Sequence, residues 1–185
     1  MKKYKILALI GESGTGKDYL MKQVLWRYPQ YHEIISCTTR PIRENEKNGI
    51  NYYYLTEEEF AAADLLEATS FNGWRYGTST SALDPSSANI GVFNPDGIRN
   101  LLKRDDVDVK VFRVWVNDKE RLMRQLTRES NPNVTEIIRR YNTDQQDFLN
   151  LEFEHKILPN RNWADVIDAL GYLDPSALWA ESDNC

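Results

Sequence analysis

The sequence predicts an α/β fold in which a mostly parallel sheet is covered by helices. Apolar strand-like runs alternate with helix-like segments over most of the 185 residues, a pattern typical of parallel sheets. Between residues 38 and about 80 this alternation gives way to short strands and one helix, which indicates a small lobe inserted into the larger unit. The length suits one domain with a sizeable core, so residues 1–185 are expected to form a single domain.

The first predicted unit is a strand, a glycine-rich loop and a helix. The apolar run Lys5–Ile10 is expected to form the strand, and the helix is expected to run from Tyr19 to Tyr28. Between them, Gly11–Lys17 (GESGTGK) has the G-x-x-x-x-G-K spacing of a phosphate-binding loop. Glycines let backbone N–H groups converge on an anion, the lysine reaches the outer phosphates, and the start of the helix favours negative charge. The pattern predicts that the loop binds a nucleoside triphosphate.

The remaining elements are assigned from apolar runs, caps and turn residues. A strand is expected at Glu33–Cys37, before a polar, proline-containing loop at 38–46. The lobe is expected to contain a strand at Asn51–Leu55, a helix from the capping box Thr56–Glu59 to Asp64, and a hairpin of Leu65–Phe71 and Trp74–Thr78 around Asn72-Gly73. Beyond it we expect strands Ile90–Phe93, Val109–Val116 and Lys156–Leu158, helices Ile98–Arg104, Lys119–Arg128, Val134–Phe153 and Trp163–Leu170, and a loose tail.

Charge and cysteine content exclude several classes of protein. A net charge of −5 argues against a general nucleic-acid binder, which needs a basic surface. The two cysteines, Cys37 and Cys185, form neither a disulfide framework nor a zinc pattern. The apolar run near the start is too short for a signal peptide or a membrane span, so we expect a cytoplasmic protein with no membrane partner.

Two arginines in the loop after the second strand form a candidate anion site. Arg40 and Arg43 lie three residues apart around Pro41, and two guanidinium groups can grip one phosphate through paired hydrogen bonds. The hydroxyl groups of Tyr52 and Tyr76 could complete such a cage. From these residues alone, a solvated charged loop is an equally good interpretation.

The order of polar residues from position 36 onward resembles the signature of the guanylate kinase family. The matching positions are Ser36, Thr38, Thr39, Arg40, Arg43, Glu46, Gly49, Tyr52, Glu67 and Tyr76-Gly77-Thr78-Ser79. With the phosphate loop, the resemblance covers residues 5 to about 170. It implies a three-layer P-loop kinase fold with a core at about 1–37 and 88–170, a lobe at about 38–80 that binds a nucleoside monophosphate, and a helical lid at about 124–145.

The resemblance also implies an activity and the residues that support it. The implied reaction transfers the γ-phosphoryl group of ATP to GMP or dGMP with Mg²⁺, in a monomer or homodimer. The residues implied to bind GMP are Ser36, Arg40, Arg43, Glu46, Tyr52, Glu67, Tyr76, Thr78 and Asp96. Those implied to bind ATP are Gly11, Ser13, Gly14, Thr15, Gly16, Lys17, Asp18 and Asn160. Guanine presents N1–H and N2–H donors, so an ionised Glu67 would suit it and would be left unpaired against adenine.

Basic residues further along are implied to act on the transferring phosphoryl group. Arg124 and Arg128 lie four residues apart on one predicted helix and can face a common anion. With Lys17, the resemblance implies catalytic roles for Arg128, Arg140 and Arg124. For Arg124 and Arg139, a basic solvated face remains the alternative.

Two positions depart from the family pattern. Asp18 stands where the loop would have a hydroxyl residue that binds Mg²⁺, and Asn94 stands where a carboxylate is usual before Asp96. Asp18 and Asp96 are the candidate metal residues, Asp96 acting through water. Since Mg²⁺ tolerates water-mediated oxygen ligands, our hypothesis is that the carboxylate has moved from position 94 to position 18.

Three other functions remain open from the sequence. One is a deoxynucleoside monophosphate kinase of altered base specificity, as in viral nucleotide supply. Another is a kinase that acts on a sugar phosphate and would not need Glu67. The third is a non-catalytic module that binds a phosphorylated peptide in the acceptor pocket, with Asp18 as its support.

Overall fold

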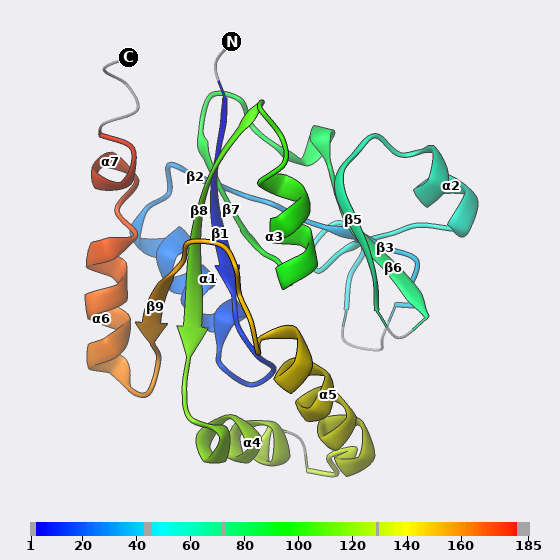
Figure 1. The fold of residues 1–185 in the computed structure, drawn as a ribbon, viewed down its shortest axis with the longest axis vertical. Coiled ribbons are helices and arrows are strands. Elements are labelled where there is room, and N and C mark those ends of the chain that lie inside the picture. Colours follow the sequence, from blue (N-terminus) through cyan, green and yellow to red (C-terminus); the bar gives the residue numbers. More distant parts are fainter. Residues whose placement is uncertain (1–2, 43–45, 72, 129, 181–185) are drawn as a thin grey trace.

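The computed structural model describes residues 3–42, 46–71, 73–128 and 130–180 and has a parallel sheet at its centre (Figure 1). Its strand order is β2-β7-β1-β8-β9, and every neighbouring pair is parallel. The strands are β1 (Tyr4–Ile10), β2 (Tyr31–Glu33), β7 (Ala88–Val92), β8 (Val107–Trp115) and β9 (Lys156–Pro159). Because all five run in one direction, the loops after them meet at one edge of the sheet, where α/β proteins bind ligands.

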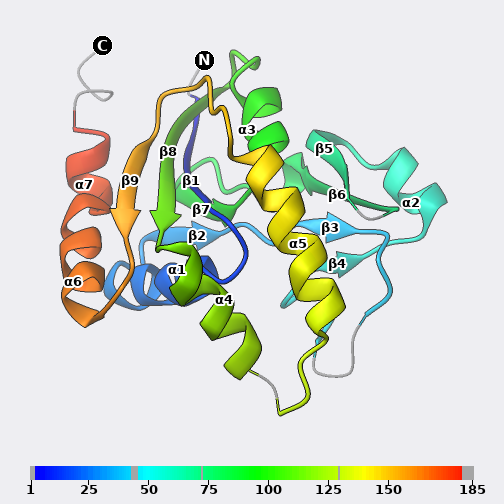
Figure 2. The ribbon, with the colours of Figure 1, turned by 60° about the horizontal axis from the view of Figure 1, so that its bottom comes forward.

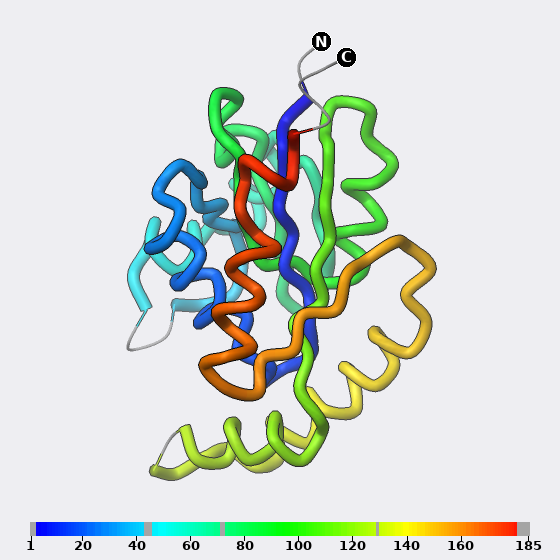
Figure 3. Tube along the Cα trace, turned by 90° about the vertical axis from the view of Figure 1, so that its left-hand side faces the viewer, coloured from blue at the N-terminus to red at the C-terminus, as the bar shows by residue number. Residues whose placement is uncertain are grey.

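Helices cover both faces of this sheet, as the alternation of strands and helices predicts. On β1, Leu7 and Leu9 face a core shared with α1 (Lys17–Arg27) and α6 (Trp163–Tyr172). Ile6, Ala8 and Ile10 face the opposite core, which includes residues of α3 (Pro95–Leu101). Figure 3 shows α1 and α6 on one side of the sheet and α3 on the other. The predicted three-layer α/β fold is therefore confirmed.

A second, smaller sheet lies beside the large one and corresponds to the predicted insertion. Its order is β4-β3-β6-β5, with strands β3 (Cys37–Thr38), β4 (Tyr53–Tyr54), β5 (Leu65–Phe71) and β6 (Trp74–Ser79). The β5–β6 hairpin and the capping box that opens α2 (Glu57–Ala62) are confirmed, while Asn72 in the turn lies outside the described residues. The strand expected at Asn51–Leu55 is shorter than predicted.

The strand expected at Glu33–Cys37 is wrong, because this stretch passes from one sheet to the other. Ile34 N–H still donates to Ile90 O in the large sheet, at 2.8 Å. Cys37 instead pairs with Gly77 and Tyr53 in the small sheet. One apolar run therefore serves two sheets and forms two short strands.

Two long helices lie beyond the carboxyl ends of the strands, next to the phosphate loop (Figure 2). They are α4 (Asp118–Thr127) and α5 (Val134–Asp147), each opened by an asparagine cap as predicted. The expected end of α5 at Phe153 is wrong, since the helix stops at Asp147 and Phe148 enters the core next to α3. Among the described residues, no helix is long and apolar enough to cross a membrane.

The chain after α6 packs against the core, so the prediction of a loose tail is wrong up to residue 180. A short helix, α7 (Pro175–Leu178), brings Trp179 into contact with the Tyr31 ring, edge to face at 6.3 Å. The Trp179 side chain is only 2% exposed. The core therefore extends beyond the expected limit at about residue 170.

Candidate active site

The loop between β1 and α1 has the conformation that its glycines permit. Gly14 and Gly16 have φ angles of 84° and 88°, which larger residues rarely adopt. A Cβ atom at Gly14 would lie 2.4 Å from Arg121 O, so α4 approaches the loop closely at this point. The Thr15 hydroxyl donates to Glu12 O at 2.9 Å, which closes a turn inside the loop. The predicted donor residues 11–18 are thus brought together at the carboxyl end of β1.

Lys17 lies within this loop with its amino group close to the backbone. Its Nζ donates to Gly11 O at 2.8 Å and to Glu12 O at 3.1 Å. Burial lowers the pKa of Lys17, while the carboxylates of Asp18, Asp144 and Glu12 oppose that shift. A half-buried cation at the start of a helix favours the binding of an anion.

Asn160 and Arg124 connect this loop to the segment after β9. Asn160 Nδ2 donates to Thr15 O at 2.8 Å, and Arg124 Nη2 donates to Asn160 O at 2.7 Å. Arg124 Nη1 also reaches Thr15 O at 3.3 Å. In this structure Arg124 therefore supports the loop through carbonyl groups, which is a more specific role than a solvated basic face.

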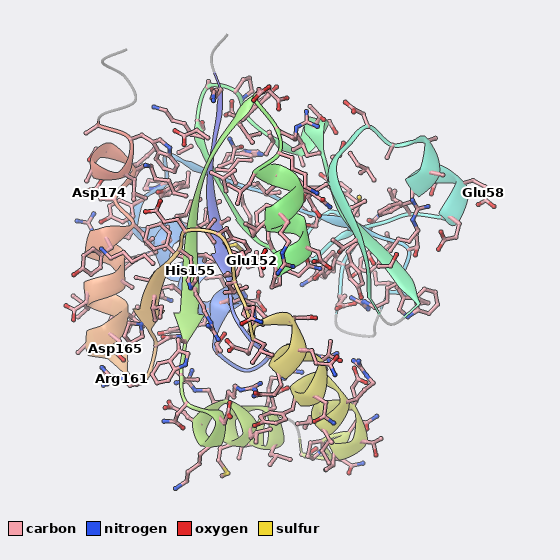
Figure 4. The ribbon with its side chains drawn as sticks, in the orientation of Figure 1. Glu58, Glu152, His155, Arg161, Asp165 and Asp174 are labelled. Atoms are coloured by element: carbon pink, nitrogen blue, oxygen red, sulfur yellow. The ribbon has the colours of Figure 1, made fainter. Side chains whose placement is uncertain are left out.

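A cavity of about 380 Å³ opens next to these contacts. It is lined by Gly16, Tyr19, Arg124, Asn160, Arg161, Asn162, Trp163 and Val166. Arg161 and Asp165 lie near the start of α6 (Figure 4), and their side chains pair at 2.8 Å. The cavity combines aromatic and polar groups beside the phosphate loop, which suits the base and sugar of a nucleotide.

The small sheet presents an arginine inside a tyrosine cluster. Arg40 is 8% exposed and its Nη2 lies 2.9 Å from Glu46 Oε1, while Tyr54 OH donates to Glu46 Oε2 at 2.9 Å. The Arg40 guanidinium lies 5.6 Å from the ring centres of Tyr52 and Tyr54, and the Tyr52 and Tyr76 rings are 6.0 Å apart. Glu46 thus holds Arg40 in place. Arg43 lies outside the described residues.

Glu67 and Thr78 face each other across the β5–β6 hairpin. Thr78 Oγ1 donates to Glu67 Oε1 at 2.8 Å, and the two residues are 8% and 0% exposed. Burial raises the pKa of Glu67 to about 7, although the hydrogen bonds from Thr78 oppose the shift. Ser36 immediately precedes β3, and its carbonyl accepts the Tyr53 N–H at 2.9 Å. Of the three residues expected to read a base, the structure joins Glu67 to Thr78 and places Ser36 at the start of the neighbouring strand.

The start of α3 accounts for Asn94 and Asp96 in structural terms. Asn94 Oδ1 accepts the Gly97 N–H at 2.7 Å as the helix cap, and its Nδ2 donates to Thr69 Oγ1 at 2.9 Å. Asp96 pairs with Arg99 at 2.7 Å. The Asn94 amide thus caps α3 through its oxygen and binds Thr69 of β5 through its nitrogen, and an aspartate carboxylate could not donate this second hydrogen bond.

The arginines of α4 and α5 are placed at the same edge of the sheet. Arg139 and Arg140 both pair with Glu136, at 2.7 and 2.8 Å. The hydrogen bonds that Arg139 donates to Glu136 raise the pKa of Arg139, and Tyr76 contributes to the same shift, which puts α5 within electrostatic range of the tyrosine cluster. Arg128 forms the C-cap of α4 and is exposed.

Three loop contacts were not predicted from the sequence. Ser13 N–H donates to Asp144 Oδ2 of α5 at 2.8 Å, and Gln125 Nε2 of α4 donates to Ser13 O at 3.2 Å. Arg113 of β8 pairs with Glu12. Of these residues, Arg113 alone has a sequence signal, because it is a charged residue inside an apolar strand. Asp144 and Gln125 lie among other polar residues of α5 and α4, so the sequence does not distinguish them.

The described residues contain no group of three or more His, Cys, Asp or Glu side chains that could hold a metal ion. Asp18, in the first turn of α1, is exposed beside Lys17. A single carboxylate is enough for Mg²⁺ when phosphates and water provide the other ligands. Asp18 fits that arrangement, whereas the carboxylate of Asp96 is already paired with Arg99.

Comparison with known proteins agrees with this geometry. The sequence profile of guanylate kinase matches residues 3–172. The chain belongs to the guanylate kinase family. Curated guanylate kinases are 40% identical over 83 residues in Nostoc sp. (43% of this chain, 42% of the relative) and 36% over 115 residues in Sus scrofa (57% and 58%). The match to the guanylate kinase of Leifsonia xyli is longer, at 29% over 171 residues (87% and 66%).

The alignment with the Nostoc guanylate kinase spans less than half of that relative's length. Among solved structures, guanylate kinase from Anaplasma phagocytophilum has a TM-score of 0.67 over 98% of this chain and 87% of its own, at 18% identity. This likeness supports the P-loop kinase fold across both sheets and α4–α5.

Proposed function

We propose that this guanylate kinase family member transfers the γ-phosphoryl group of ATP to GMP or dGMP. The observation that carries the proposal is Glu67, a buried carboxylate fixed by Thr78 in a sheet that also presents the Arg40 cage. A base-reading carboxylate, a phosphate cage and a formed phosphate loop in one chain match the needs of a nucleoside monophosphate kinase.

On the acceptor side, base and phosphate are recognised by different parts of the small sheet. Ionised Glu67 accepts hydrogen bonds from N1–H and N2–H of guanine, while Thr78 holds the carboxylate and Ser36 lies nearby. Arg40, Tyr52 and Tyr76 bind the acceptor phosphate, and Glu46 orients Arg40. Adenine has no donor at N1, so it would leave a buried carboxylate unpaired, which is costly.

On the donor side, the loop N–H groups and Lys17 bind the ATP phosphates, and Asn160 borders the cavity for the adenosine. Arg128 and Arg140 neutralise charge on the transferring group as α4 and α5 close over both nucleotides as a lid. Phosphoryl transfer asks mainly for alignment and charge neutralisation, and closure excludes the water that would waste ATP. The net charge of −5 also favours small nucleotides over nucleic acid as partners.

Mg²⁺ bound between the phosphates would neutralise part of their charge. We propose that Asp18 holds its water shell, because this carboxylate is exposed at the end of the phosphate loop and beside Lys17. Asp96 contributes less, since it is paired with Arg99.

A second candidate function is a non-catalytic module that binds phosphorylated peptides, favoured by Asp18 in place of a hydroxyl residue. Calorimetry separates the two. The kinase should bind ATP–Mg²⁺ and should bind GMP or dGMP more tightly than AMP. Binding of a phosphoserine peptide without any binding of ATP–Mg²⁺ would overturn the kinase proposal. A preference for another monophosphate would instead indicate a kinase of altered base specificity.

A further inference from the structure

The phosphate loop is joined to α5 by a side chain that is not among the residues predicted to bind either nucleotide. Asp144 Oδ2 accepts the Ser13 N–H at 2.8 Å, and Asp144 Oδ1 lies 3.4 Å from Ser13 Oγ. Ser13 is in the middle of the loop, between Gly11 and Gly16. A charge-assisted bond to a backbone N–H is among the stronger hydrogen bonds in proteins. The contact therefore restrains the loop itself and not only one of its side chains.

Asp144 is held in turn by a buried arginine. Arg121 Nη1 lies 3.1 Å from Asp144 Oδ2, and the two side chains are 1% and 13% exposed. The Arg121 guanidinium also stacks on Tyr141, 4.4 Å from the ring centre, and its Nε donates to Asp118 at 2.8 Å. Among the described residues, none accepts a hydrogen bond from Arg121 Nη2. A cation buried so completely depends on Asp144 and Asp118 for its charge balance.

The opposite side of the same loop residue is also fixed. Gln125 Nε2 donates to Ser13 O at 3.2 Å, so α4 and α5 hold the N–H and the C=O of Ser13 between them. The loop needs such a restraint, because Gly11 and Gly14 have positive φ angles and are conformationally free. A loop that is ordered before the ligand arrives does not have to lose that freedom on binding.

We infer that Asp144 is a positioning residue for the donor site: anchored by Arg121, it pre-orders the phosphate loop through the Ser13 N–H. This inference rests on the proposed function, since it concerns ATP bound in the loop. Arg140 lies one turn before Asp144 on α5, so the same bond also restrains the helix that carries this arginine. The carboxylate of Asp144 also opposes the lowering of the Lys17 pKa caused by burial and by Arg121.

The test compares two carboxylates that bind the same arginine. Asp144→Ala removes the acceptor for Ser13 N–H, and Asp144→Asn keeps an acceptor oxygen but loses the charge. Asp118→Asn likewise removes only the charge of the other carboxylate that binds Arg121, and Asp118 does not contact the loop. Amide hydrogen exchange at Ser13 is measured without nucleotide, and the Kd values of ATP–Mg²⁺ and GMP are measured by calorimetry.

For Asp144→Ala we expect Ser13 exchange and the ATP Kd each to rise by about tenfold, with the GMP Kd unchanged. Asp144→Asn should lie between this variant and the wild type, and remains informative if the alanine variant does not fold. Asp118→Asn should leave all three quantities unchanged.

Two results would overturn the inference. One is an ATP Kd in both Asp144 variants that equals or falls below the wild-type value. The other is an Asp118→Asn variant that behaves like Asp144→Ala, which would assign the effect to the charge of Arg121. If instead the wild type fails to bind ATP, the proposed function fails, while the Ser13 exchange result still reports on the restraint.

Discussion

Replacement of Glu67 by glutamine separates the two consequences of burying this carboxylate. The side chain is 8% exposed, and burial raises its pKa from 4.5 to about 7. At about 1.4 kcal/mol per pH unit, this shift corresponds to roughly 3 kcal/mol. The folded state holds the proton more tightly than the unfolded state, so the contribution of Glu67 to stability is complete below pH 4.5 and is lost as the pH rises through 7.

Glu67→Gln removes this titration with little change in shape. In urea unfolding, its free energy of unfolding should be close to the wild-type value at pH 4.5 and exceed it by up to roughly 3 kcal/mol at pH 8. The affinity for GMP should change with pH in the opposite direction to the stability. Wild-type affinity should increase from pH 6 to pH 8 as Glu67 ionises, whereas the variant should bind GMP about tenfold or more weakly at pH 8 and show no such pH dependence.

Two results would refute this reasoning. An unchanged preference for GMP over AMP in Glu67→Gln would show that another group reads the base. A difference in unfolding free energy that stays constant from pH 4.5 to pH 8 would show that Glu67 has an ordinary pKa in the folded protein. Thr78→Val is a matched control, because it removes the hydrogen bond to Glu67 and should raise the pKa of Glu67 further.

Three further predictions concern other parts of the site and the core. Arg40→Lys should raise the GMP KM by about tenfold with little change in the ATP KM, because lysine cannot make paired hydrogen bonds to a phosphate. Equal changes in both KM values would contradict the assignment of Arg40 to the acceptor phosphate. Asp18→Asn should raise the Mg²⁺ concentration needed for turnover, and its effect should be coupled to that of Asn94→Asp, as expected for a carboxylate moved between these positions. Effects that add to within about 0.5 kcal/mol would contradict this hypothesis. Trp179→Ala should lower the free energy of unfolding by about 3 kcal/mol, because this side chain is almost fully buried. Trp179→Phe should lower it by less, because no described residue accepts a hydrogen bond from Trp179 Nε1. Unchanged stability of Trp179→Ala would show that the last helix is not part of the core.

The layered fold was predictable because its signals are local. Apolar strands, glycine positions and caps each specify their own element, so β1, the phosphate loop, α2 and the β5–β6 hairpin follow from the sequence. The exceptions are segments whose fate depends on distant partners. Residues 33–37 divide between two sheets, and Trp179 is buried only because α7 folds back on Tyr31.

In the candidate site, too, residues in local motifs were predictable and contacts between distant residues were not. Glu67, Thr78 and Arg40 were expected from motif order, and the structure adds why each is held in place. The contact between Asp144 and Ser13 joins residues 131 positions apart and could not be predicted, because an aspartate on a polar helix face gives no sign of its partner. Asn94 has a structural role that the motif did not indicate, since its amide caps α3 and donates to Thr69. The hypothesis that a carboxylate has moved from position 94 to position 18 stays a prediction.

The central claim is that one chain joins a phosphate loop to a guanine-reading acceptor site. Its most direct test is ATP- and Mg²⁺-dependent turnover across the ribo- and deoxynucleoside monophosphates, with Lys17→Met as the inactive control. We expect labelled phosphate from the γ position of ATP to appear in GDP or dGDP, at rates well above those for AMP, CMP and UMP. Binding of ATP and GMP without any transfer, or equal rates with AMP and GMP, would contradict the account.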